Sequence, residues 1–253
     1  MKILLTGYKG FIGSNLLKAL SDHEVSVYEW GDQRIDINVD VCIHIGAISS
    51  TAERNVEKIM QQNYEFSVWL LDTCNKHGVD FQYSSSASIY GLGDNFNETA
   101  PVDPKTPYAW SKYLFERYAT SKHCNVSVQG FRYFNVYGPG EEHKNDQASP
   151  YHKFEKQAKS GVITLFENSE EYKRDFIHVS SVCDAHLKFL YIKKSGIWNV
   201  GTGSTKSFLD VANEVNINHN ARIEYVPMPE LMKASYQKYT CANMEKFNKT
   251  ILS

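Results

Sequence analysis

The residues with the clearest chemical potential are a tyrosine and a lysine four positions apart, Tyr108 and Lys112. On a helix, residues at this spacing share one face, so the lysine ammonium would lie near the phenol oxygen. A neighbouring positive charge favours phenolate and would bring the tyrosine pKa closer to neutrality. Such a tyrosine can take a proton from a hydroxyl group and return it. Upstream, a predicted strand runs into Ser84-Ser85-Ser86, and Ser86 could hydrogen-bond the reacting oxygen.

Three glycines form a second motif between the first apolar segment and the first helical pattern: Gly7, Gly10 and Gly13. The first suits a tight turn, the second lets the backbone approach a pyrophosphate, and the third lets the helix pack on the strand. The first residues of the expected helix, Phe11 and Ile12, would offer free N–H groups and a positive dipole end to phosphates. The pattern and its position predict a nucleotide-binding loop.

Charged residues after the second predicted strand bear on the choice of dinucleotide. Glu29 stands at the strand end, where an acidic residue usually binds the ribose hydroxyls. Arg34 follows closely and could instead hold a 2′-phosphate, with help from Lys9. NAD and NADP both remain possible on these residues.

The motifs require a scaffold in which strands and helices alternate. Apolar runs predict strands, and apolar residues at helical spacing predict the helices between them. We expect strands at 2–5, 25–30, 41–45, 81–84, 126–131, 162–166, 175–179, 197–200 and 222–226, and helices at 11–20, 55–77, 108–123, 181–191 and 208–215. Because parallel strands need crossover connections, this order predicts an α/β fold with a doubly wound parallel sheet, a Rossmann fold.

The same pattern suggests how the chain divides. We expect residues 1–137 to form a dinucleotide-binding domain, to which the elements of 175–200 return. Residues 138–253 would then form mainly a smaller, interleaved substrate-binding region. The stretch 138–150 is rich in glycine, proline and charge, and we expect it to lie outside the core.

Composition excludes several classes of protein. The 253 residues include 27 basic and 29 acidic side chains, a formal charge of −2, which argues against a dedicated nucleic-acid binder. The five cysteines are scattered without a CxxC pair, so we expect reduced thiols, a cytoplasmic protein and no metal centre. No apolar stretch approaches the roughly 20 residues of a membrane span.

Taken together, the glycine loop, the serine segment and the tyrosine–lysine pair resemble the extended short-chain dehydrogenase/reductase superfamily, in its NAD-dependent epimerase/dehydratase branch. Further segments fit the same pattern: HIGA (44–47), SSSASIYG (84–91), FRYFNVYGP (131–139), RDFIHV (174–179) and NVGTG (199–203). Dehydratases of this branch need an acidic pair just after the catalytic serine. Ala87 and Ser88 stand there, which disfavours dehydration.

Other segments are similar to the ADP-glycero-manno-heptose 6-epimerases, which make the heptose donor for bacterial lipopolysaccharide: GAISST (46–51), EEHKNDQAS (141–149), LFENSEEYKRDF (165–176) and YQKYT (236–240). This resemblance implies that NADP oxidises the C6 hydroxyl to a ketone and that hydride returns to the opposite face. It also implies that Lys144 is a second acid/base, opposite Tyr108. Spacing alone would make Lys144 an ordinary solvated lysine.

The resemblance assigns further residues one at a time. It implies cofactor contacts at Ser49, Asn63, Val136 and Lys112, and it makes Asp36 and Ile37 the remnant of an adenine-binding segment. It implies substrate contacts at Ser86, Asn135, Phe166, Glu167, Asn168, Ser169, Arg174 and Tyr236. The planar fork of Arg174 suits a phosphate that it grips with two hydrogen bonds.

Two other functions stay open: another nucleotide-sugar 4-epimerase or keto-sugar reductase of the superfamily, and a non-catalytic dinucleotide sensor. The expected partners are a nucleotide-diphosphate sugar and other copies of the chain. Members of the superfamily commonly associate through two long helices, here 55–77 and 107–123, with Trp69 and Phe115 as candidate contacts.

The chain is also shorter than is usual for that family. Only ten residues separate Trp30 from Val41, where a strand and a helix normally fit. We further expect no helix after residues 236–240.

Overall fold

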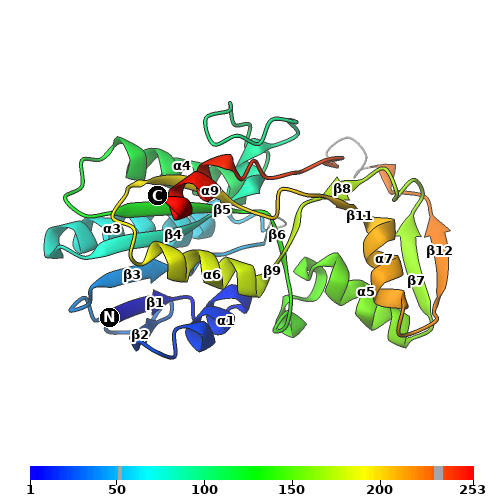
Figure 1. The fold of residues 1–253 in the computed structure, drawn as a ribbon, viewed down its shortest axis with the longest axis horizontal. Helices are drawn as coiled ribbons and strands as arrows, with labels where there is room; N and C mark the ends of the chain where they lie inside the picture. The colour runs from blue at the N-terminus through cyan, green and yellow to red at the C-terminus, as the bar shows by residue number, and fades with distance from the viewer. Residues whose placement is uncertain (51–52, 231–235) are drawn as a thin grey trace.

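A six-stranded, fully parallel sheet organises the larger part of the molecule (Figure 1). The computed structural model describes residues 1–50, 53–230 and 236–253. In the order β10-β5-β4-β3-β1-β2, the strands are β10 (Gly196–Val200), β5 (Val128–Tyr133), β4 (Asp80–Ser86), β3 (Val41–His44), β1 (Lys2–Thr6) and β2 (Glu24–Tyr28). The predicted α/β doubly wound fold is therefore confirmed.

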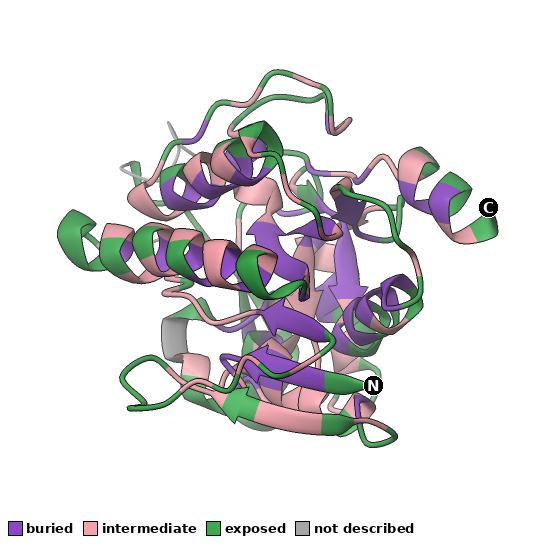
Figure 2. Ribbon diagram, turned by 90° about the vertical axis from the view of Figure 1, so that its left-hand side faces the viewer, coloured by how far each residue is buried: buried purple, intermediate pink, exposed green. Residues whose placement is uncertain are grey.

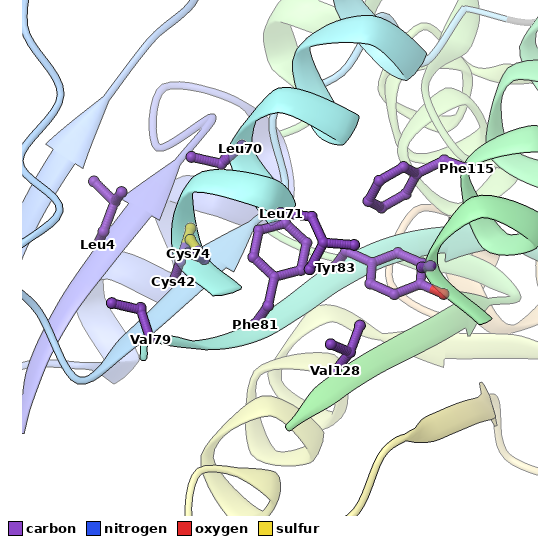
Figure 3. Close-up of a cluster of buried hydrophobic side chains, with 11 residues drawn as sticks. Leu4, Cys42, Leu70, Leu71, Cys74, Val79, Phe81, Tyr83, Phe115 and Val128 are labelled. Atoms are coloured by element: carbon purple, nitrogen blue, oxygen red, sulfur yellow. The ribbon is translucent and has the colours of Figure 1, made fainter. Parts of the chain in front are cut away.

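Helices cover both faces of this sheet, because successive side chains of its buried strands point to opposite sides. Ile3 and Leu5 of β1 pack toward α1 (Phe11–Ala19) and α6 (Val179–Phe189). Leu4 packs in the opposite cluster, beneath α3 (Phe66–His77) and α4 (Pro107–Ser121) (Figure 3). Figure 2 shows that these helices bury one side and expose the other.

The long helix predicted over 55–77 contains a local irregularity. It runs from α2 (Val56–Ile59) into α3 through one π-helical turn, η1 (Met60–Glu65). Asn63, one of the expected cofactor contacts, lies in this turn and is almost fully buried. Single π-helical turns within helices often lie at functional sites.

The smaller part of the fold packs two helices on a pair of parallel strands. Its elements are α5 (Pro150–Lys159), β7 (Val162–Phe166), α7 (Phe208–Asn216) and β12 (Arg222–Val226), with a separate apolar core. Two short pairs lie between the parts: parallel β6 (Asn135–Tyr137) with β9 (Phe176–His178), and antiparallel β8 (Lys173–Arg174) with β11 (Lys206–Ser207). Figure 1 shows this smaller part beside the carboxyl ends of the sheet strands.

Three expectations about local structure are wrong. The stretch 138–150 is not excluded from the core, because Glu141, Ala148 and Ser149 are buried around a 3-10 helical segment, η3 (Glu142–Gln147). Helix α6 begins at Val179, before the predicted start, because the His178 side chain caps it by accepting the Ser180 N–H. A further helix, α9 (Glu245–Leu252), follows residues 236–240.

Residues 29–40 form neither a strand nor a helix, so β2 is the edge strand of the sheet. Ile35, Ile37 and Val39 nevertheless pack against the core under α3. Among the described residues, no helix is long and apolar enough to cross a membrane.

Candidate active site

The glycine loop lies at the carboxyl end of β1 and leaves no room for side chains. Gly7 has φ +74°, and a Cβ there would come within 2.5 Å of the Gly46 backbone. A Cβ at Gly13 would come within 2.0 Å of the Gly7 carbonyl oxygen. No side chain caps the start of α1 at Gly10, so its first N–H groups face the space above the loop.

A cavity of about 310 Å³, the inner cavity, opens above this loop. The predicted residues that line it are Gly7, Gly10, Phe11, Ile12, Gly13, Glu29, Ser49, Tyr108, Lys112 and Lys144. The structure thus brings together the glycine loop and the tyrosine–lysine pair, although about 100 residues separate them in the sequence.

Charged residues at the end of β2 differ in their relation to the inner cavity. The Glu29 carboxylate lines it and accepts the Lys9 N–H at 2.7 Å, which ties the strand end to the glycine loop. Arg34 and Asp36 are exposed and do not line the cavity, and Asp36 instead accepts the Asn38 N–H. Ile37 packs in the core.

Asn63 and Ser49, both expected to contact the cofactor, have different positions. Ser49 lines the inner cavity directly. The Asn63 amide accepts the Ile48 N–H at 2.8 Å, donates to the Ile48 carbonyl at 2.9 Å and donates to Ser111 Oγ at 3.1 Å. It therefore fastens the loop after β3 to helix α4 and does not line the cavity.

The tyrosine–lysine pair projects from the first half of α4 toward the end of β4. The helix begins where Thr106 accepts the Ala109 N–H, with Pro107 in the first turn. The Lys112 ammonium lies 6.0 Å from the centre of the Tyr108 ring and donates to the Ser84 carbonyl at 2.9 Å. Hydrogen bonding links Tyr108 to Ser86.

The expected lowering of the tyrosine pKa is not observed. Burial raises the pKa of Tyr108, and the hydrogen bond with Ser86 only partly opposes this. Burial also lowers the pKa of Lys112 to about 8, while the carboxylate of Glu116 acts in the opposite direction. The Lys112 ammonium donates to the carbonyl and hydroxyl of Ser84.

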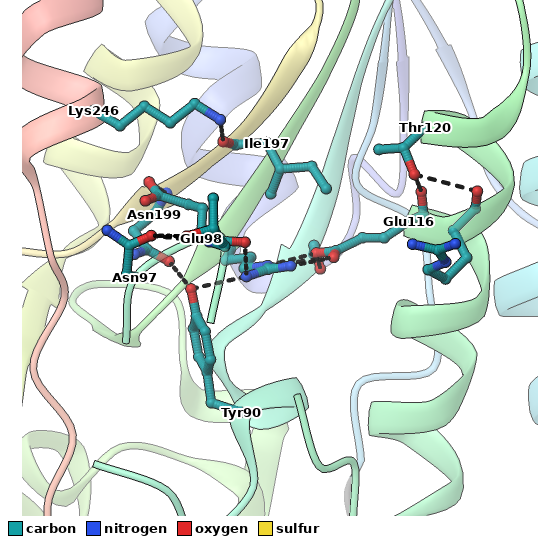
Figure 4. Close-up of polar contacts among 12 residues, drawn as sticks. Tyr90, Asn97, Glu98, Glu116, Thr120, Ile197, Asn199 and Lys246 are labelled. Atoms are coloured by element: carbon teal, nitrogen blue, oxygen red, sulfur yellow. Dashed lines mark hydrogen bonds and ion pairs between the residues drawn. The ribbon is translucent and has the colours of Figure 1, made fainter. Parts of the chain in front are cut away.

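A buried ion pair holds the second half of α4 against the sheet (Figure 4). Arg132 of β5 donates to both carboxylate oxygens of Glu116, and the two side chains are only 5% and 2% exposed. The carboxylate also accepts the Ser85 hydroxyl at 2.5 Å, and Arg132 donates to the Tyr90 hydroxyl at 2.9 Å. The pair therefore connects α4, β4 and β5 directly behind the tyrosine–lysine pair.

Lys144 lines the inner cavity from a different element, the 3-10 segment η3. Its ammonium is 4.8 Å from the centre of the Phe11 ring and 3.8 Å from the Glu141 carboxylate. Burial lowers the pKa of Lys144, and Glu141 opposes this. Glu141 is only 1% exposed, and its carboxylate accepts N–H groups of Gly138 and Ser149 and the Ser149 hydroxyl.

A second cavity of about 560 Å³, the middle cavity, adjoins the first and shares Tyr108 and Lys144 with it. The predicted residues Phe11, Ile12 and Ser49 also line both cavities, and those that line only the middle one are Ser86, Asn135, Val136, Arg174 and Tyr236. The Arg174 guanidinium packs against the rings of both Phe208 and Tyr236, 5.5 and 5.4 Å from their centres. Burial lowers the pKa of Arg174. Because the ordinary arginine pKa lies far above neutrality, the guanidinium remains charged.

A third cavity of about 490 Å³, the outer cavity, lies in the smaller part of the fold and meets the middle cavity at Tyr236. Phe166 and Ser169 line it together with the aromatic side chains of Phe154, Tyr172 and Phe208. Glu167 and Asn168 are exposed and do not line it.

Two residues with evident roles in this geometry were not predicted. Glu141 anchors the Lys144 loop, and Ser88 lines the middle cavity beside Ser86. A carboxylate three positions before a lysine in a glycine- and proline-rich loop was the available signal for Glu141. Nothing in the sequence pattern distinguishes Ser88 from the serines before it.

Comparison with known proteins places this architecture in a family. Residues 32–201 match the NAD dependent epimerase/dehydratase family. An ADP-L-glycero-D-manno-heptose-6-epimerase from Helicobacter pylori is similar, with 26% identity, a TM-score of 0.86, and 99% of this chain and 89% of that chain covered. A UDP-glucose 4-epimerase from Thermus thermophilus is similar with 26% identity, a TM-score of 0.83, and 98% and 92% covered.

A UDP-N-acetylglucosamine 4-epimerase from Methanobrevibacter ruminantium shares the fold, with a TM-score of 0.90 at 22% identity and with 99% of this chain and 91% of that chain covered. The matched range 32–201 includes Ser86, Tyr108, Lys112 and Lys144. The protein is therefore an enzyme that belongs to the NAD dependent epimerase/dehydratase family.

Proposed function

We propose that the protein is a nucleotide-sugar epimerase that oxidises one carbon of the sugar and re-reduces it from the opposite face. The observation that carries this proposal is the placement of Tyr108 and Lys144. Both line the inner and the middle cavity, from different elements, and each bears a group that can exchange a proton. Inversion at one carbon requires hydride addition to both faces of that carbon, and two such groups allow each face to have its own acid and base.

The inner cavity fits a nicotinamide dinucleotide. The glycines leave space that side chains would fill, and the uncapped start of α1 offers N–H groups to a pyrophosphate. Ser49 and Lys112 would contact the same molecule. When bound, the dinucleotide would accept hydride from the carbon that bears a hydroxyl group and return it later.

We propose NAD as the preferred dinucleotide. The Glu29 carboxylate lines the inner cavity at the strand end, where it would accept ribose hydroxyls and repel a 2′-phosphate. Arg34, which supported NADP in the sequence, does not line that cavity. Replacing Glu29→Gln should raise NADP affinity relative to NAD, by about tenfold if one unit-charge repulsion of about 1.4 kcal/mol is removed. Fluorescence titration with NADH and NADPH measures this ratio.

Tyr108 would serve one face as acid and base. As phenolate it takes the proton of the substrate hydroxyl, and as phenol it returns one to the ketone oxygen. Ser86 hydrogen-bonds Tyr108 and would hydrogen-bond the same substrate oxygen. The positive charges of Lys112 and of an oxidised nicotinamide would lower the tyrosine pKa that burial raises.

Lys144 would serve the opposite face. Its pKa is lowered by burial, which makes the neutral amine more accessible than in an exposed lysine. The nearby Glu141 carboxylate keeps the ammonium form available as a proton donor. One catalytic cycle needs both the neutral amine and the ammonium form of Lys144.

The middle and outer cavities would hold the rest of the substrate. Arg174, which packs against two aromatic rings, suits a diphosphate, and the aromatic outer cavity with Phe166 and Ser169 suits a nucleoside base. Asn135 and Tyr236 line the connection. We propose an ADP-glycero-manno-heptose as the substrate and epimerisation at C6, which would place the enzyme in lipopolysaccharide biosynthesis.

A UDP-sugar 4-epimerase is the second candidate, because the similarity to the Thermus thermophilus enzyme is at the same 26% identity. Such a reaction rotates the sugar in the site and uses only the tyrosine. Lys144 therefore discriminates between the two candidates.

The test is to incubate the NAD-loaded protein with ADP-heptose of each C6 configuration and, separately, with UDP-glucose, and to separate the products by chromatography. We expect interconversion of the two heptose epimers. In single turnovers, Tyr108→Phe should abolish reduction of the cofactor by one epimer and Lys144→Met by the other. Each loss should be at least about 10²-fold, the usual contribution of an acid/base group.

Lys18→Met is the matched control for Lys144→Met, since Lys18 is exposed on α1 and lines none of the three cavities. Conversion of UDP-glucose that survives Lys144→Met would favour the second candidate. Absence of conversion for all three sugars would contradict the proposed epimerase activity.

We also propose that the protein self-associates through α3 and α4. Trp69 and Trp110, one on each helix, are each 47% exposed. Phe115, the other candidate contact, is core instead. Light scattering should show a larger species for the native protein than for a Trp69→Glu/Trp110→Glu variant.

A further inference from the structure

Two serine hydroxyls stand out because they are buried without a hydrogen-bond partner. Over the side chains of residues 1–50, 53–144, 147–230 and 236–253, Ser88 Oγ and Ser169 Oγ are the only nitrogen or oxygen atoms in that state. Buried polar groups are nearly always paired, because an unpaired one retains its full desolvation penalty. An exception that lies in a cavity wall therefore points to a group that a ligand can complete.

Both exceptions lie in cavity walls. Ser88 lines the middle cavity, beside Ser86 and Tyr108, and Ser169 lines the outer cavity. The two hydroxyls thus mark opposite ends of the space proposed for the substrate. The resemblance had already implied a nucleotide contact for Ser169, whereas Ser88 had no assigned role.

We propose that Ser88 is a substrate-binding residue whose hydroxyl hydrogen-bonds a hydroxyl group of the sugar. This inference rests on the proposed function, because it takes the sugar to lie beside Ser86 and Tyr108. It adds a contact that determines which sugar is accepted.

The local geometry fixes the backbone of Ser88 and leaves its side chain free to turn. Ser88 lies in the 3-10 turn η2 (Ala87–Tyr90), and its N–H donates to Ser86 Oγ at 3.2 Å. The residue as a whole is partly exposed, whereas Oγ is shielded. Because no hydrogen bond holds the hydroxyl, it is free to take another staggered position of χ1, and the proposal requires the position in which it faces the cavity.

The chemistry of the group also fits this role. A serine hydroxyl donates one hydrogen bond and accepts others, as a sugar hydroxyl does, so the two pair in either direction. Unlike a carboxylate, it does not remove a proton from carbon at neutral pH. Ser88 therefore adds recognition next to the catalytic Ser86 without promoting elimination of water.

The test compares sugar nucleotides with the nucleoside diphosphates alone. The protein is loaded with NADH, so that a sugar hydroxyl cannot be oxidised, and is titrated with UDP, UDP-glucose, ADP and ADP-glycero-manno-heptose by calorimetry. Ser88→Ala should weaken binding of the preferred sugar nucleotide roughly three- to tenfold, the range of one lost hydrogen bond. Its affinity for the corresponding nucleoside diphosphate should be unchanged.

Two reference variants make the outcome specific. Ser169→Ala should weaken the sugar nucleotide and the nucleoside diphosphate equally, since Ser169 lies at the outer cavity. Ser21→Ala, an exposed serine at the end of α1, should change neither affinity. The melting temperature of ligand-free Ser88→Ala should not fall, because the substitution removes a hydroxyl that has no partner.

Equal affinities of Ser88→Ala and the native protein for the sugar nucleotide would overturn the inference and leave the proposed function intact. Equal losses for sugar nucleotide and nucleoside diphosphate, with a lower melting temperature, would show a structural role and also overturn it. If the native protein binds neither sugar nucleotide, the proposed function fails first, and the inference fails with it.

Discussion

The two sides of the middle cavity hold their reactive groups by different means. Tyr108 projects from a helix of 15 residues whose second half is fixed by the buried Glu116–Arg132 ion pair. Lys144 projects from a loop with a single 3-10 segment, and one buried carboxylate, Glu141, holds that loop in place. The helix side is supported by backbone hydrogen bonds, packing and an ion pair together.

This difference teaches where each side is vulnerable. On the helix side, a local change spreads into the core, because the ion pair joins α4 to two strands of the sheet. On the loop side, a change at Glu141 should remain local and affect mainly the position and pKa of Lys144. Substitutions on the helix side should therefore lower stability most, and those on the loop side should change the reaction of one epimer.

The largest expected effect is the loss of Arg132. Arg132→Met leaves the Glu116 carboxylate buried without its cation, which typically costs about 3–5 kcal/mol of the free energy of unfolding. Urea denaturation followed by circular dichroism measures this loss. The double variant Arg132→Met/Glu116→Leu should recover most of it, because the unpaired charge is gone. A loss below about 1 kcal/mol in the single variant would contradict the structural role assigned to the pair.

The next effect is a pH dependence that comes from Lys112. Its pKa is about 8 in the folded protein, against about 10.4 in an unfolded chain. Between these values the unfolded chain binds a proton that the folded protein lacks, so stability rises as pH increases through this window. Below pH 8 Lys112 is charged in the folded protein, so the full free-energy cost of burying its ammonium group is present.

Lys112→Met removes this dependence. The stability difference between the native protein and the variant should therefore shift in favour of the native protein by on the order of 3 kcal/mol from pH 7 to pH 10.5. Denaturation curves at several pH values measure the shift. Lys18→Met, which replaces an exposed lysine, should show no comparable change, and a flat difference for Lys112→Met would disprove the assigned cause.

The same contrast explains what could be predicted from the sequence. The glycine loop and the Tyr108–Lys112 pair are local patterns, in which spacing on one element determines geometry. The sheet followed from the alternation of apolar segments. Asn63 was expected to touch the cofactor, but its amide groups are used by the Ile48 backbone, which a sequence pattern does not reveal.

The loop side lacked such patterns. Helix α5 was missed although Ser149 and Pro150 are a standard helix start. Glu141 belongs to the stretch 138–150 that we expected outside the core. Its burial depends on donors that a sequence pattern does not reveal, here the N–H groups of Gly138 and Ser149. Lys144 was identified only by resemblance, since the short 3-10 segment that contains it has no recognisable sequence pattern.

A smaller effect is expected at Glu141. In Glu141→Gln, an NH2 group replaces one carboxylate oxygen and must face a donor whose hydrogen bond that oxygen accepted. We therefore expect a loss of about 1–3 kcal/mol in the free energy of unfolding. Loss of the negative charge should also lower the pKa of Lys144 further, because Glu141 raises it. The pH profile of the half-reaction that depends on Lys144 should then move to lower pH. The half-reaction that depends on Tyr108 should keep its profile, and a parallel shift of both would remove the distinction between the two sides.

The smallest effect tests which contacts of Glu141 matter. Ser149→Ala removes the hydroxyl that donates to Glu141 at 2.7 Å and that caps α5 by accepting the His152 N–H. The Ser149 N–H still donates to the carboxylate at 2.6 Å, so Glu141 keeps its backbone anchors. We expect a loss of about 1 kcal/mol in the free energy of unfolding, the usual value of an N-cap, with little change in the half-reaction of Lys144.

Ser207→Ala removes the equivalent cap of α7, which has no link to Glu141, and should match this stability loss. If Ser149→Ala slows the Lys144 half-reaction while Ser207→Ala does not, the hydroxyl, and not the backbone, positions the carboxylate that holds the lysine.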